Sequence, residues 1–196
     1  MGRRRTGIEE KIMESAGELF YLNGYPNTGI AEIVQKAGTN KTSFYQYYSS
    51  KDELGLKYVA YFSRGMLRKV IRLMRKYSNP GDFSQSWFAL VSRNMKKSAR
   101  FNGCPVANFS AQLESGKETE NEYIRGQSGR WIKVLAVYFR QAIASGHLSK
   151  ELDPEQLAEM LFIAYHGALV SWRLTGNMNA AERASCLFSG FIKKNN

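Results

Sequence analysis

Apolar residues recur along this chain at intervals of three and four, and no stretch shows the two-residue alternation of a β-strand. Near the N-terminus, Ile8, Ile12, Ala16 and Leu19 follow the helical spacing. A first helix is therefore predicted here, and Asn23-Gly24 provides a suitable C-terminal stop.

Two short helices are expected next, joined by a glycine turn at Gly38. Thr28 can cap the first of them, and Thr39 or Asn40 can cap the second, which runs to about Tyr48.

A long helix is predicted from Lys51 to Tyr77, where only two tolerable glycines interrupt the helical pattern. At roughly 1.5 Å per residue it would be about 40 Å long, enough to join two domains.

Further helical segments follow, so the pattern predicts an all-α protein of about nine helices. Asp153-Pro154 marks one start clearly, and Asn179 with Glu182 forms a capping box for the last helix. The segments are about 83–99, one opening at Pro105, about 124–145, 154–175 and one after Asn179.

The net charge of +11 over 196 residues favours an anionic partner such as nucleic acid. Much of it lies on Arg64, Arg68, Arg72 and Arg75, which form one stripe of the long helix. Two interpretations stay open for this stripe: a solvated helix face, or an electropositive flank for DNA or an acidic ligand.

Several classes of protein are disfavoured by the composition. The longest uncharged runs have 13 residues, too short for a membrane span, and the N-terminus lacks the apolar stretch of a signal peptide, so no membrane partner and a cytoplasmic location are expected. The two cysteines and two histidines stand too far apart for a familiar metal or disulfide spacing.

The helices of residues 28–48 suit insertion into the major groove of DNA, which requires a short helix held by a partner helix. Phe44 and Tyr48 can anchor it against the core. Polar side chains that suit phosphates and base edges then point outward: Lys41, Thr42, Ser43, Gln46 and Tyr47.

A set of local motifs in this region is similar to the N-terminal domain of tetracycline-repressor (TetR) family regulators. The matching residues are Gly24-Tyr25, Thr28, Ile33, Ala37-Gly38, Ser43-Phe44-Tyr45, Tyr47-Tyr48 and Ser50-Lys51-Asp52-Glu53-Leu54. The resemblance covers about residues 8–60, and the rest of the chain is alike only in being helical.

The resemblance implies a homodimeric repressor that binds a palindromic operator in double-stranded DNA and is released by a small-molecule inducer, without a cofactor. It implies a helix-turn-helix domain over residues 1–50 and a helical ligand-binding and dimerisation domain over residues 51–196. Thr28, Tyr45, Tyr47 and Lys51 fall where the family touches phosphate, and Asn40 to Ser43 fall where it meets the groove. Thr42 departs from the family pattern, in which many members carry glycine or a small residue.

Ahead of this domain, Arg3, Arg4 and Arg5 form a basic arm. It suits either a minor-groove contact or a solubilising tail.

Aromatic residues in the last two thirds of the chain provide enough mass to line an apolar pocket, although a plain core is the alternative. Trp87, Trp131 and Tyr165 are the candidates, with His166 as a polar anchor. The uncharged segment 160–172 carries small residues at helical spacing, which suits the four-helix dimer bundle that the resemblance implies.

Cys104 precedes a predicted helix start at Pro105, where the helix dipole lowers the pKa of a thiol. With Asn108, it resembles a branch of the family that senses electrophiles or oxidants, whereas free cysteine is more often a small buried hydrophobe. A helical enzyme with Cys104 as nucleophile, and an adaptor that has lost its DNA, are the alternatives from other classes.

Overall fold

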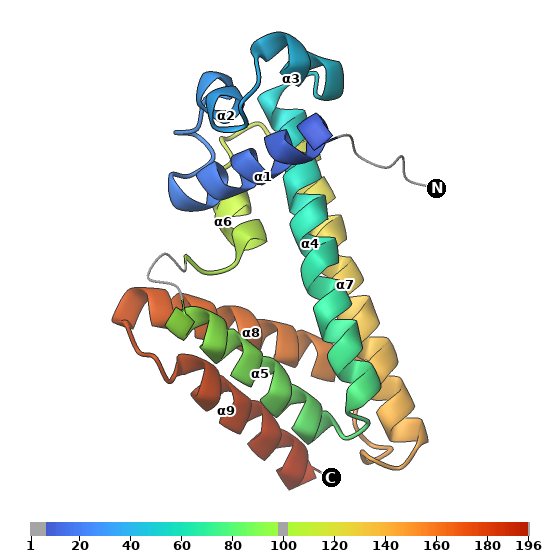
Figure 1. Cartoon of the computed structure of the whole chain (residues 1–196). Helices are drawn as coiled ribbons and strands as arrows, with labels where there is room; N and C mark the ends of the chain where they lie inside the picture. Colours follow the sequence, from blue (N-terminus) through green and yellow to red (C-terminus); the bar gives the residue numbers. More distant parts are fainter. Residues whose placement is uncertain (1–6, 98–101, 196) are drawn as a thin grey trace. The chain divides into compact units, whose positions relative to one another are not determined.

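The computed structural model describes residues 7–97 and 102–195, and within them every regular element is an α-helix (Figure 1). The predicted all-α class is thereby confirmed, while the basic arm of Arg3, Arg4 and Arg5 lies outside the described residues. The nine helices of the described part are α1 (Gly7–Leu22), α2 (Ile30–Lys36), α3 (Lys41–Tyr47), α4 (Lys51–Lys76), α5 (Pro80–Lys97), α6 (Pro105–Ala111), α7 (Glu118–Ala144), α8 (Pro154–Thr175) and α9 (Ala180–Asn195).

Contacts divide the chain into two compact units. The first contains the chain as far as Arg64 together with Pro105–Arg125, and the second contains Gly65–Cys104 and Gly126–Asn196. The expected boundary followed residue 50, but the structure keeps the first half of α4, all of α6 and the start of α7 with the N-terminal helices.

In the first unit, α1, α2 and α3 pack around one apolar core. Gly24 and Gly38 have φ values of 89° and 63°, left-handed conformations that glycine adopts without strain, and they stand at the two turns between these helices. Each helix is short, so its stability depends on burying one face. The core residues supplied by the three helices include Ile12, Ala16, Leu19, Phe20, Ile33, Val34 and Phe44.

Helix α6 completes this core through Phe109, which is 3% exposed. Its ring centroid lies 4.6 Å from that of Tyr25 and 6.3 Å from that of Tyr58. A Cβ at Gly55 would come within 2.6 Å of the Phe109 ring, so only glycine permits this close approach to α4. The packing explains why α6 belongs with helices that precede it by some fifty residues.

The predicted caps divide into those that form and those that do not. Asn40 caps α3, and Asp153 caps α8, which ends at Gly176 with φ of 67°. Thr28 does not cap α2: the N-cap is Gly29, without a side-chain hydrogen bond. The expected box at the start of α9 is also replaced, because the Glu182 carboxylate accepts hydrogen bonds from α5 instead.

In the second unit, α9 packs against both α5 and α8, and aromatic side chains fill the core. Trp87 of α5 contacts Trp131 of α7 and Tyr165 of α8, and Phe83 and Phe88 of its own helix pack against it. The described helices include none that is long and apolar enough to cross a membrane.

Candidate DNA-binding site

Helix α3 is anchored to the core on one face and polar on the other. Phe44 is fully buried and Tyr48, directly after the helix, is 1% exposed. At the opposite end, Asn40 Oδ1 accepts a hydrogen bond from the backbone N–H of Ser43 at 2.9 Å. The cap satisfies one of the free N–H groups of the first turn and holds the start of the helix in place.

The outward face of α3 brings together the polar residues expected from the sequence. Asn40, Lys41, Thr42, Tyr45 and Gln46 are exposed, while Ser43 and Tyr47 are half-buried. No ion pair of Lys41 is found among the described residues, so its ammonium is available to an external anion. A lysine, hydroxyls and two amides on one short helix suit phosphate oxygens and base edges.

Lys51, at the first position of α4, is held against Tyr25. Its Nζ donates a hydrogen bond to the Tyr25 carbonyl at 3.1 Å and lies 4.5 Å from the centroid of that ring. An ammonium has three donors, so Lys51 keeps donors for a phosphate while its position is restricted.

A polar network around Asp52 links three separate segments of the first unit. The Tyr25 hydroxyl donates a hydrogen bond to Asp52 Oδ1, and Lys117 Nζ pairs with Asp52 Oδ2 at 2.6 Å. The hydrogen bonds from Lys117 and Tyr25 lower the pKa of Asp52, while burial and then Asp52 raise the pKa of the Tyr25 phenol. No local sequence pattern predicts this network, because Lys117 stands 65 residues from Asp52 along the chain.

Glu53 stabilises the start of α4. Its carboxylate accepts from the backbone N–H and hydroxyl of Ser49 at 2.6 and 2.7 Å and pairs with Lys57 at 2.7 Å. These hydrogen bonds, that from Lys57 being the largest, lower the pKa of Glu53 to about 2. Because Lys57 neutralises it, this carboxylate adds little repulsion toward an approaching phosphate.

Thr28 does not lie on the exposed surface that a phosphate contact requires. The residue is fully buried, and its hydroxyl donates to the Gly24 carbonyl at 2.8 Å. Its side chain thus stabilises the turn between α1 and α2, and the expectation of a phosphate contact by this hydroxyl does not fit the structure.

Family models match both parts of the chain. The model described as bacterial regulatory proteins, tetR family, matches residues 12–56, which include α2, α3 and the start of α4. The model described as tetracyclin repressor-like, C-terminal domain, matches residues 83–188, more than half of the chain. The chain belongs to the TetR family. It is therefore a DNA-binding transcriptional regulator, and neither the enzyme nor the DNA-free adaptor describes it.

Other TetR-family proteins resemble it over most of their length. The transcriptional repressor DhaR of a Mycobacterium species is 22% identical over 91% of this chain and 89% of its own, and the regulator AcuR of Cereibacter sphaeroides is 28% identical over 84% and 76%.

Solved structures of the family share the fold. A TetR regulatory protein from Rhodobacter sphaeroides has a TM-score of 0.79 at 23% identity, covering 94% of this chain and 98% of that one. Bacillus subtilis FadR, solved in complex with stearoyl-CoA, has a TM-score of 0.73 at 14% identity, covering 92% and 97%.

The candidate ligand residues of this TetR-family chain fall in different places. Trp87, Trp131 and Tyr165 are buried together in the second unit, and the Nδ1–H of the half-buried His166 donates a hydrogen bond to the Phe162 carbonyl, 3.0 Å away. Burial lowers the pKa of His166. Cys104 is half-buried and packs against the same core. Asn108 lies on α6 and belongs to the first unit.

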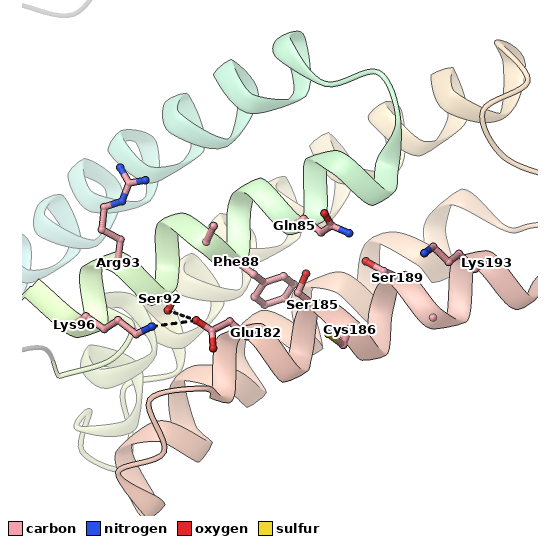
Figure 2. Close-up of a pocket in the computed structure, with 12 residues that line it drawn as sticks. Gln85, Phe88, Ser92, Arg93, Lys96, Glu182, Ser185, Cys186, Ser189 and Lys193 are labelled. Atoms are coloured by element: carbon pink, nitrogen blue, oxygen red, sulfur yellow. Dashed lines mark hydrogen bonds and ion pairs between the residues drawn. The ribbon is translucent and has the colours of Figure 1, made fainter.

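A groove of about 740 Å³ between α5 and α9 was not anticipated from the sequence (Figure 2). At one end Glu182 accepts hydrogen bonds from Ser92 and Lys96, at 3.0 and 3.1 Å. Lys193 lies at the other end and the exposed Cys186 lies between them. The lining comes from two helices nearly a hundred residues apart, so sequence spacing holds no signal for it.

Proposed function

We propose that this TetR-family regulator is a homodimeric repressor that reads a palindromic operator with α3 of each protomer and leaves it when a small molecule binds the second unit. The observation that carries the proposal is the capped, core-anchored helix α3 with its exposed polar face, inside the region that matches the family's DNA-binding domain.

Phosphate contacts are assigned to Tyr45, Tyr47, Lys41 and Lys51, which lie on α3 and at the start of α4. Base readout is assigned to the exposed Thr42 and Gln46, with Asn40 and Ser43 at the groove-facing end of α3. Thr28 is left out of the contact set because its hydroxyl is internal.

An unusually apolar exposed face supports the dimer. Ile163, Val170 and Leu174 of α8 are 68%, 54% and 80% exposed, and their spacing of seven and four places them on one side of the helix. Leu187 of α9 is 76% exposed. Grouped exposed aliphatic side chains mark interaction surfaces, and a second copy supplies the same apolar chemistry across a two-fold axis.

Release by a small molecule is supported by the aromatic core of the second unit, and a solved relative, FadR, holds stearoyl-CoA. A ligand shifts the protein off DNA only by binding the DNA-incompetent conformation better, and a hundredfold loss of affinity needs about 2.7 kcal/mol of preference.

Thiol sensing through Cys104 is the competing trigger. It requires an accessible thiolate, whereas Cys104 is half-buried against an apolar core. A Cys104→Ser variant that no longer leaves DNA on treatment with an electrophile, while Cys186→Ser still does, would favour the thiol mechanism over the pocket ligand.

The test of the proposal combines footprinting on the DNA upstream of the chain's own gene with sedimentation. Footprinting should show two half-sites about one helical turn apart, roughly 34–36 Å, or a related larger spacing. Leu174→Glu should convert the dimer to monomer and weaken operator binding, while Leu90→Glu, on the half-buried side of α5, should leave the dimer in place. A wild-type chain that sediments as a monomer at micromolar concentration would refute the dimer.

A further inference from the structure

The N–H group of the Trp87 indole is buried without a hydrogen-bond partner in the described part of the chain. Trp87 is 1% exposed, so solvent does not replace the missing acceptor. Buried polar groups in proteins are almost always hydrogen-bonded, and an exception calls for an explanation such as a ligand that completes the bond.

Aromatic faces surround this donor. The ring of Tyr165 is stacked on Trp87 with centroids 5.1 Å apart, and Trp131 is stacked at 6.2 Å. Phe88 lies at 6.2 Å and Phe83 at 5.8 Å. These rings come from α5, α7 and α8, and all belong to the second unit. An aromatic ligand would find the same stacking contacts that these rings now make with one another.

Formal charge is absent from the buried part of this unit as described. The buried polar residues there are serines together with Gln127, one helical turn before Trp131, and no Asp, Glu, Lys or Arg is among them. His166, beside Tyr165, has a lowered pKa because of burial and is therefore neutral near pH 7. An ionic ligand group would lie here without a counter-ion, which is strongly unfavourable.

We propose that the core of the second unit binds an uncharged aromatic molecule with a carbonyl or similar oxygen that accepts a hydrogen bond from Trp87 Nε1. The proposal rests on the small-molecule release put forward above and specifies the chemical class of the inducer. It also distinguishes this core from the α5–α9 groove, whose lysines and Glu182 suit charged groups.

Binding must move the aromatic rings apart. An inserted ring needs about 7 Å between the two rings that enclose it, twice the roughly 3.5 Å contact distance between carbon atoms, whereas Trp87 and Tyr165 are 5.1 Å apart. The ligand therefore selects a conformation in which α5 and α8 are farther apart at this level. Because the free protein populates this conformation only in part, the apparent affinity for the ligand is reduced by that fraction. The same spreading is a change of the second unit that an inducer can exploit.

The decisive experiment compares two probes of nearly equal shape, 2-acetylnaphthalene and 2-isopropenylnaphthalene, of which only the first has an oxygen acceptor. Their dissociation constants are measured calorimetrically on the full-length wild type, Trp87→Phe and Trp131→Phe. In each protein the dissociation constant of one probe is divided by that of the other, and this ratio is compared between proteins. The comparison removes the effects of the probes' different solubilities and of the ring volume lost in the variant, because both affect the ratios equally.

One hydrogen bond is worth about a fivefold to tenfold change in affinity. The preference for the acetyl probe should therefore fall about fivefold to tenfold in Trp87→Phe and stay unchanged in Trp131→Phe. An equal preference in all three proteins overturns the proposal, as does the absence of binding by either probe to the wild type.

A second readout needs no variant at the donor itself. In an ¹H–¹⁵N spectrum of the wild type, the Trp87 indole signal should move downfield with the acetyl probe and much less with the hydrocarbon. The Trp172 indole, which already donates to Met178 Sδ at 3.3 Å, serves as the internal reference, and Trp131→Phe identifies the remaining signal. Equal shifts with both probes overturn the proposal even if Trp87→Phe fails to fold.

Operator binding measured on the same samples distinguishes failure of the ligand class from failure of the proposed DNA-binding function. Operator binding without probe binding would refute the ligand class and leave the DNA-binding function standing. Probe binding with the expected acceptor preference but without release from the operator would support the site and count against small-molecule release through it.

Discussion

The contact between Gly55 and Phe109 allows a quantitative prediction about the packing of α6 on the DNA-binding unit. In Gly55→Ala, the new Cβ would lie 2.6 Å from Phe109 Cζ and 3.1 Å from Tyr25 Cε2, so these rings must shift. Overpacking of this kind costs about 1–3 kcal/mol, while alanine within a helix gains about 0.8–1.0 kcal/mol over glycine. The expected net effect is a loss of about 0–2 kcal/mol in the free energy of unfolding.

Phe109→Ala removes the ring that causes this overlap. Truncation of a buried phenylalanine costs about 3–5 kcal/mol, and Phe109 is 3% exposed against Tyr25 and Tyr58. In the double variant the overlap with Phe109 no longer exists and the alanine methyl fills part of the cavity. We expect the double variant to be about 1–3 kcal/mol more stable than the sum of the two single losses predicts.

The assay is urea unfolding followed by far-UV circular dichroism at one fixed protein concentration, because assembly would make stability concentration-dependent. Gly65→Ala is the matched control: it lies in the same helix, and no atom lies within 4 Å of its added Cβ. It should stabilise the helix by about 0.8–1.0 kcal/mol and add simply to Phe109→Ala. If Gly55→Ala behaves like Gly65→Ala, the close packing of α6 on α4 is wrong.

Three further predictions concern α3 and α4. Lys51→Ala should weaken binding to all DNA sequences alike and make the slope of log affinity against log salt concentration shallower by about one unit. Lys133→Ala, which removes an exposed lysine of α7, should leave that slope unchanged. An unchanged slope in Lys51→Ala would remove Lys51 from the phosphate contacts. Asn40→Ala should cost about 1 kcal/mol of stability through the lost α3 cap, and Asn40→Ser should restore most of it, whereas equal stabilities would show that the cap contributes nothing. The folded-state pKa of Glu53 is about 2, below the ordinary 4.5, so the stabilisation from its ionised carboxylate is complete above about pH 4.5 and is lost as the pH falls toward 2. The wild type should therefore be more stable than Glu53→Gln at neutral pH, and urea unfolding should show this difference shrink between pH 4.5 and 2. A difference that stays constant over this range would contradict the lowered pKa.

Local chemistry explains which features could be predicted from the sequence. The start of α8 at Asp153-Pro154, its end at Gly176 and the Asn40 cap of α3 depend on neighbours within four residues, so their signals are contained in short motifs. The outward polar face of α3 follows in the same way, because Phe44 and Tyr48 are about one helical turn apart and share the buried side, which leaves Tyr45 and Gln46 between them exposed.

Some local expectations failed because a distant or competing partner was available. Thr28 donates back to the Gly24 carbonyl instead of capping α2, and Glu182 accepts from Ser92 and Lys96 of α5 instead of closing a box on its own helix. A hydroxyl or carboxylate has several possible partners of similar strength, and only the packed fold decides which lies within reach.

The sequence by itself determined the helices, their turns and the polar surface of α3, because helical periodicity, caps and glycine turns act over a few residues. Tertiary structure alone decided that Phe109 of α6 completes the N-terminal core, that Lys117 reaches Asp52, and that the Trp87 indole lacks an acceptor. The first two features join residues more than 50 positions apart, and the third depends on everything that surrounds one buried atom. They arise when apolar surfaces are buried together, a non-directional force that leaves no spacing rule in the chain.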